Sequence, residues 1–140
     1  MKNNFEERLK GGHPNSLGNT IEVVEEVLLD HSLFDELFGC YYSNDEVVRL
    51  RVSNAVKRVS KVERALVVDK MDELISSISK IDQASTQWTL SWLFRFLAKD
   101  MSENQLKEAK KIMRNNLANH TDWIVLNNTM DTLGKWSKKR

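Results

Sequence analysis

Three stretches of this 140-residue chain can be laid over one another at nearly constant spacing. They are residues 48–52 (VRLRV), 86–90 (TQWTL) and 125–129 (VLNNT), so that corresponding positions lie 38 and then 39 residues apart. An internal repeat of this length is typical of proteins that stack one helical hairpin on the next. The repeat therefore predicts three helical hairpins of about 38 residues each, at about 31–60, 62–98 and 102–136.

Apolar residues within these stretches recur at helical spacing. Val48, Val52, Ala55, Val56 and Val59 are three or four residues apart, which places them on one face of an α-helix. One proline and five glycines leave too few turn formers for an all-β sandwich or barrel. We therefore expect an all-α protein, with helices at 20–30, 32–41, 45–59, 62–80, 83–98, 102–118 and 121–136.

Turn-forming residues gather near the start of the chain. The only proline and three of the five glycines lie within residues 11–18, which predicts a loop. We expect residues 1–18 to be a charged lead followed by this loop. Residues 19–140 are then one repeat domain, in which the helix at 20–30 caps the first hairpin.

The first hairpin resembles the HEAT repeats, close relatives of the armadillo repeats. The resemblance is carried by Leu37-Phe38, by Asn44-Asp45 in the turn and by Val48-Arg49, followed by Val52, Ala55 and Val56. It implies an α-solenoid of about three HEAT-like hairpins with an N-terminal capping helix, whose second helices line a concave face. It also implies binding of proteins or nucleic acid without catalysis.

The sequence contains no recognisable catalytic or metal-binding motif. Cys40 is the only cysteine, and no base is positioned to activate it. The three histidines share no motif, and Gly11-Gly12 lacks the rest of a phosphate-binding loop. We expect no catalytic residue, no cofactor and no metal, and no contact with a membrane. Because there is also no signal peptide and no long apolar run, we expect a cytoplasmic protein.

Two tryptophans in the middle repeat lie outside the predicted core. Trp88 and Trp92 are four residues apart, with Arg95 next along the same face, while Leu90, Leu93, Phe94 and Leu97 form the core register. Tryptophan and arginine are enriched at binding hot spots. The alternative is packing against the next repeat. The predicted partner-binding set is Trp88, Trp92 and Arg95 with Arg49, Leu50, Asn54 and Asn127.

Charge is segregated along the chain, although the net charge is only +1. Residues 20–48 contain eight acids and no lysine or arginine, whereas residues 49–64 contain six basic residues and one acid. Under one interpretation, the acidic and basic side chains of neighbouring helices neutralise each other's charge. Under the other, the basic helix binds phosphate or an acidic protein surface through Arg49, Arg51, Lys57, Arg58, Lys61 and Arg64.

These observations predict a non-enzymatic scaffold that binds a protein segment in the concave groove. The alternative is a nucleic-acid-binding repeat protein that uses the basic helix 49–64, or, more remotely, a protein similar to the alkylated-DNA glycosylases, with Asp131 as the candidate acid. The chain is expected to be a monomer or a homodimer, in which either the helix with Ile21, Val24 and Leu28 or the last helix with Trp136 would supply a self-complementary patch.

Overall fold

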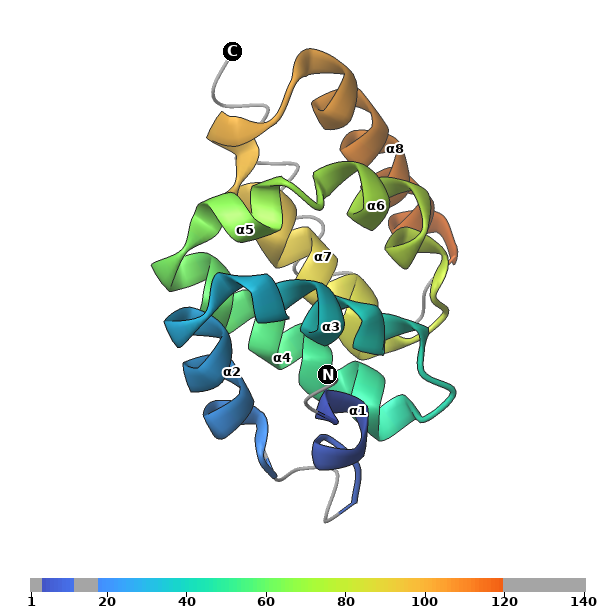
Figure 1. Ribbon diagram of the computed structural model, residues 1–140. Helices are drawn as coiled ribbons and strands as arrows, with labels where there is room; N and C mark the ends of the chain where they lie inside the picture. The colour runs from blue at the N-terminus through green and yellow to red at the C-terminus, as the bar shows by residue number, and fades with distance from the viewer. Residues whose placement is uncertain (1–3, 12–17, 120–140) are drawn as a thin grey trace. The chain divides into compact units, whose positions relative to one another are not determined.

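The computed structural model describes residues 4–11 and 18–119 of the chain. These residues are helical and contain no strand, which confirms the all-α class (Figure 1). No helix among them is long and apolar enough to cross a membrane. The chain divides into two compact units, Met1–Val67 and Val68–Arg140, with the boundary inside α5 (Arg64–Val68). This division differs from the single domain expected over 19–140.

The described part of unit 1 contains four α-helices and two short 3₁₀ turns before α5. In chain order they are α1 (Phe5–Arg8), α2 (Thr20–Leu29), η1 (His31–Leu33), α3 (Phe34–Gly39), η2 (Cys40–Tyr42) and α4 (Glu46–Val62). The helices expected at 20–30, 32–41 and 45–59 therefore form, the second with a 3₁₀ turn at each end.

α4 begins where the sequence predicts a helix start. The Asp45 side chain accepts a hydrogen bond from the Val47 N–H at 2.8 Å, which satisfies one of the unpaired N–H groups of the first turn. The apolar face of α4, including Val48, Val52 and Val56, is completely buried. α2 packs beside this helix (Figure 1).

Residues 4–11 are packed into unit 1 and are not a separate lead. Phe5 and Leu9 are fully buried in unit 1, and α1 packs against α3. The Phe5 N–H donates to the Glu36 carboxylate at 3.1 Å, and Arg8 forms an ion pair with Glu26 of α2. Sequence periodicity gave no sign of this packing because α1 is only one helical turn long.

Arg51 fastens this N-terminal segment to α4. Its guanidinium, only 1% exposed, donates from Nη1 to the Leu9 carbonyl at 2.8 Å. Gly18 passes directly over the same group with a φ of +53°, and a Cβ at this glycine would lie 2.9 Å from Nη1. Glycine is thus required at position 18 both by the backbone conformation and by the close approach.

Unit 2 contains three described α-helices after α5. Its described elements are α6 (Met71–Ser76), η3 (Ile78–Lys80), α7 (Ala84–Phe96), η4 (Ala98–Asp100) and α8 (Glu103–Asn119). The helices expected at 83–98 and 102–118 are confirmed. The helix expected at 121–136, and with it the second half of the third hairpin, lies outside the described residues.

The single helix expected over 62–80 is wrong. The chain instead forms α5, turns at Asp69-Lys70, and starts again as α6. Asp72 and Glu73 then lie in the first turn of the new helix, where the helix dipole favours acidic side chains. The break directs Met71 and Leu74 into the core of unit 2.

Three successive elements recur in the two units, as α3, η2 and α4 in unit 1 and as α6, η3 and α7 in unit 2. η2 begins at Cys40 and η3 at Ile78, and α4 begins at Glu46 and α7 at Ala84, so both pairs are separated by 38 residues. Burial follows the same spacing: Val52, Ala55, Val56 and Val59 of α4 correspond to Leu90, Leu93 and Phe94 of α7 and to Leu97 directly after it, and all eight are buried. Both helices therefore present equivalent faces to their own cores.

Candidate functional site

An aromatic row runs along the face of α7 that points away from the core of unit 2. It consists of Trp88, Trp92 and Phe96, which are four residues apart and so lie one above another. Trp88 is 38% exposed. The Trp92 and Phe96 rings stack, with centroids 4.7 Å apart and an interplanar angle of 16°, and both are half-buried. The row combines a large apolar area with rings held in fixed orientation.

The other residues predicted around the tryptophans lie on equivalent faces of the two units. Arg95 is half-buried on α7 next to the aromatic row. Leu50 and Asn54 of α4, also half-buried, occupy the positions that correspond to Trp88 and Trp92 after the 38-residue shift. Asn127 lies outside the described residues.

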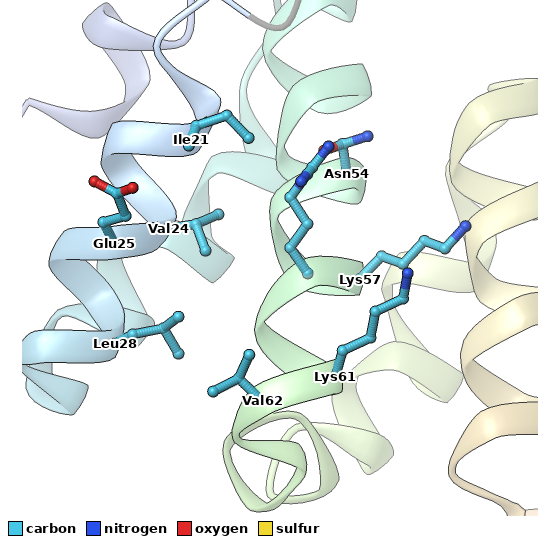
Figure 2. Close-up of a pocket in the computed structure, with 9 residues that line it drawn as sticks. Ile21, Val24, Glu25, Leu28, Asn54, Lys57, Lys61 and Val62 are labelled. Carbon is cyan, nitrogen blue, oxygen red and sulfur yellow. The ribbon is translucent and has the colours of Figure 1, made fainter.

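An open groove lies between α2 and α4 in unit 1, with a volume of about 380 Å³ (Figure 2). Ile21 lies opposite Asn54 and Leu28 opposite Val62, so the two helices run in the same direction. Val24 and Leu28 point from α2 toward α4, whereas the Glu25 carboxylate does not. The α2–α4 groove is lined by Ile21, Val24, Glu25, Leu28, Asn54, Lys57, Arg58, Lys61 and Val62.

Cations of α4 form one wall of this groove. Lys57 is half-buried, whereas Arg58 and Lys61 are exposed. The Arg58 Nε–H donates to the Asn54 side-chain oxygen at 2.7 Å, which orients the guanidinium along the helix. The predicted basic residues of this segment are thus brought together with apolar side chains of α2, a combination that charge counting alone does not reveal.

Three members of the predicted basic set are not exposed. Arg51 is buried and holds Leu9, so it is wrong to place it on an exposed basic surface. Arg49 is half-buried and donates from Nη1 to the Ser43 carbonyl at 2.7 Å. Arg64, at the start of α5, is half-buried. A long side chain that satisfies a backbone carbonyl cannot be distinguished in sequence from one that contacts a ligand.

Gln87, to which the sequence analysis assigns no role, lies at the centre of a buried polar network in unit 2. Its Nε2 donates to the Ser79 carbonyl at 2.9 Å and to the Ile81 carbonyl at 2.8 Å, and its Oε1 accepts from Asn116 Nδ2 at 3.0 Å. Both polar atoms of the Gln87 amide are therefore used for structure.

A second basic stripe lies on α8 and was also not predicted. Lys107, Lys110, Lys111 and Arg114 follow the spacing i, i+3, i+4, i+7, which places them on one side of the helix, around an open hollow of about 540 Å³. Lys111 pairs with Glu108 at 3.3 Å. This spacing is visible in the sequence and is the signal that identifies the stripe.

Cys40 has the properties of a structural thiol. It is buried, and its Sγ donates to the Glu36 carbonyl at 3.5 Å. Burial, with smaller contributions from Glu6 and Glu36, raises the pKa of this thiol to about 12. Since the thiolate is the reactive form, Cys40 is unsuited to nucleophilic chemistry at neutral pH.

Within residues 4–11 and 18–119 no three side chains of the metal-binding types gather at one place. The features that stand out are therefore surfaces: the aromatic row, the α2–α4 groove and the basic stripe of α8. Comparisons of the chain with protein-family models, with curated proteins and with solved structures gave no match.

Proposed function

We propose that this protein is a non-enzymatic interaction module, a short α-solenoid of HEAT-like hairpins capped by α2, and that it binds a segment of a partner protein. The observation that carries the proposal is the aromatic row. Trp88 keeps 38% of its surface exposed on a helix whose opposite face is packed with leucine and phenylalanine. Tryptophan is enriched at binding hot spots, where its large ring is covered by a partner.

The geometry of the row suits the binding of an extended or helical segment. The ring of Trp92 is fixed by its stack on Phe96, so that little side-chain entropy is lost when a partner covers it. Arg95 adds a cationic group at the edge of the row. Rigid aromatic anchors flanked by arginine are the usual composition of an energetic hot spot.

The repeated hairpin supports the same proposal. Leu50 and Asn54 of α4 hold the positions that Trp88 and Trp92 hold on α7, so these four members of the predicted partner-binding set lie on corresponding faces of the repeated second helix.

Affinity capture from cell lysate, with and without nuclease, tests the proposal. The bait is compared with the Trp88→Ala/Trp92→Ala variant, and with Tyr42→Ala as a matched removal of an exposed aromatic ring from unit 1. We expect a discrete protein that survives nuclease, remains with Tyr42→Ala and is lost with the double variant, provided circular dichroism shows all three chains folded. If the folded Trp88→Ala/Trp92→Ala variant captures the same protein as the wild type, the proposal is contradicted.

Nucleic-acid binding is a second candidate, and the basic stripe of α8 favours it. Four cations on one helix face are an electrostatic footprint for phosphates. Such binding must weaken steeply with salt because counterions are released. Fluorescence anisotropy with labelled single-stranded and duplex DNA over a salt series tests it, with Lys107→Glu/Lys111→Glu as the disruptive variant. No binding at low salt excludes this candidate.

A further inference from the structure

Three exposed aliphatic side chains belong to the neighbouring helices α2 and α4. Ile21 is 36% exposed, Leu29 89% and Val62 63%. They are three of the five large hydrophobic residues that the described part of the chain leaves exposed. Ile21 and Val62 line the α2–α4 groove, whereas Leu29 is the last residue of α2 and lies beyond its lining. Single exposed aliphatics are ordinary, but several on two neighbouring helices that border a groove indicate a surface that another molecule covers.

The two walls of the groove differ in charge. The charged residues of α2 are all acids: Glu22 and Glu25 are exposed, and Glu26 is already paired with Arg8. α4 contributes Lys57, Arg58 and Lys61 to the groove and no acid. The α4 wall of the groove is therefore basic, whereas the α2 wall is acidic through Glu25, which lines the groove, and through Glu22, which lies exposed beside it on α2.

A surface of this kind is complementary to itself. We propose that the α2–α4 groove is the contact surface between two copies of this chain, related by a twofold axis that runs along the groove. Rotation about such an axis places α2 of one copy over α4 of the other, and the reverse, as an isologous interface requires. Glu25 of each copy then faces Lys57 and Lys61 of the other, while Ile21, Leu29 and Val62 are removed from water.

The composition of the groove argues against other occupants. A nucleic acid laid over both helices would meet Glu25 in the groove and the exposed Glu22 beside it on α2, and would find no aromatic ring among the lining residues on which to stack a base. An acidic protein segment would meet the same repulsion. A second copy presents an acidic wall to each basic wall and a basic wall to each acidic one. This inference concerns unit 1 alone and does not depend on the aromatic row.

Sedimentation velocity over a wide range of protein concentration tests the proposal. We expect the wild type to shift from the mass of one chain to that of two as concentration rises, since dimerisation follows mass action. Glu25→Lys alone, and Lys57→Glu/Lys61→Glu alone, should each weaken self-association about tenfold or more, because like charges then face each other twice per dimer. Leu29→Ser, which changes no charge at a nearly fully exposed position, should weaken it as well.

Mixing the two charge-reversed chains gives the decisive result. The charge introduced at position 25 of one chain is then opposite in sign to the charges introduced at positions 57 and 61 of the other. Both contacts of the mixed dimer are attractive again, so it should form with wild-type affinity. Asp82→Lys and Lys99→Glu, equivalent charge changes at exposed positions of unit 2, should leave dimerisation unchanged.

Three results would overturn the proposal. The first is a wild type that remains a single chain at every concentration. The second is a dimer that tolerates the charge reversals and Leu29→Ser. The third is a pair of folded charge-reversed chains that fail to associate on mixing.

Discussion

Arg49 and Gln87 lie 38 residues apart and make the same hydrogen bond. Arg49 Nη1 donates to the carbonyl of Ser43 at 2.7 Å, and Gln87 Nε2 donates to the carbonyl of Ile81 at 2.8 Å. Each side chain reaches back six residues, to the carbonyl that follows a 3₁₀ turn. Carbonyls at helix ends lack a partner within the helix, so a long donor at this position stabilises the turn of the hairpin. Two different residue types thus have one structural role.

Replacing Gln87 with alanine should lower the free energy of unfolding more than replacing Arg49. The Gln87 amide serves two carbonyls and Asn116 in a buried network, so its loss should cost about 2–4 kcal/mol, against about 1 kcal/mol for the half-buried bond of Arg49 to Ser43. Urea unfolding followed by circular dichroism measures both. Equal, small effects of the two substitutions contradict this account of the turn.

The repeat explains how far the fold was predictable. Helical periodicity and the 38-residue spacing were enough to place α2, α4, α7 and α8, because each has a continuous apolar face. They were not enough to find α1, which is too short to show a period, or the break at Asp69-Lys70, where the apolar stripe continues across a turn. Local pattern defines a helix face, but only tertiary packing decides which short segments dock.

Thr86→Val should stabilise the protein. The Thr86 hydroxyl is fully buried and has no hydrogen-bond partner, and the corresponding position in α4 is the buried Val48. Removing an unsatisfied polar atom while retaining the side-chain shape should raise the free energy of unfolding by about 1 kcal/mol. Thr89→Val, at a position that retains some exposure, is the control. A thermal melt in which Thr86→Val unfolds at a lower temperature than the wild type contradicts the prediction.

Gly18→Ala should be strongly destabilising. Alanine would have to adopt a left-handed backbone conformation at this position, and its Cβ would push the Arg51 guanidinium away from Leu9. Together these effects should lower the free energy of unfolding by about 2–4 kcal/mol. Gly11 is the matched control, since its φ is also positive, at +77°, but no atom lies within 4 Å of the added Cβ. Gly11→Ala should therefore cost only about 1 kcal/mol. If urea unfolding shows that Gly18→Ala and Gly11→Ala lose the same free energy of unfolding, the close packing of Gly18 on Arg51 is contradicted.

Stability should fall as the pH rises above about 9, partly because of Cys40. Its pKa is about 12 in the folded protein against an ordinary value of 9.0, so the unfolded chain loses the thiol proton first. The stabilisation is complete below pH 9 and is lost as the pH rises toward 12. Burial also raises the pKa of Tyr41, which acts in the same direction. Cys40→Ala should flatten the slope of unfolding free energy between about pH 8.5 and about pH 10.5, and an unchanged slope contradicts the assignment.

The candidate site was only partly predictable, because the sequence shows the face of each helix but not which side chains and helices become neighbours. The position of Trp88 and Trp92 outside the core register of α7 followed from spacing, and the structure leaves Trp88 exposed and Trp92 half-buried. The role of Arg51 did not follow, because an arginine that anchors Leu9 and one that faces solvent have the same sequence signature. Likewise, the α2–α4 groove depends on two helices being neighbours, which no single helix reveals.

The most direct test of the proposed function places a photo-cross-linking amino acid at position 88 in living cells. p-Benzoylphenylalanine in place of Trp88 should yield, on irradiation, one discrete protein adduct that resists nuclease. The same residue in place of Lys99, an exposed position outside the aromatic row, should not yield this adduct. An adduct at position 88 alone is the result that the account predicts. Absence of any adduct, or the same products from both positions, would contradict it.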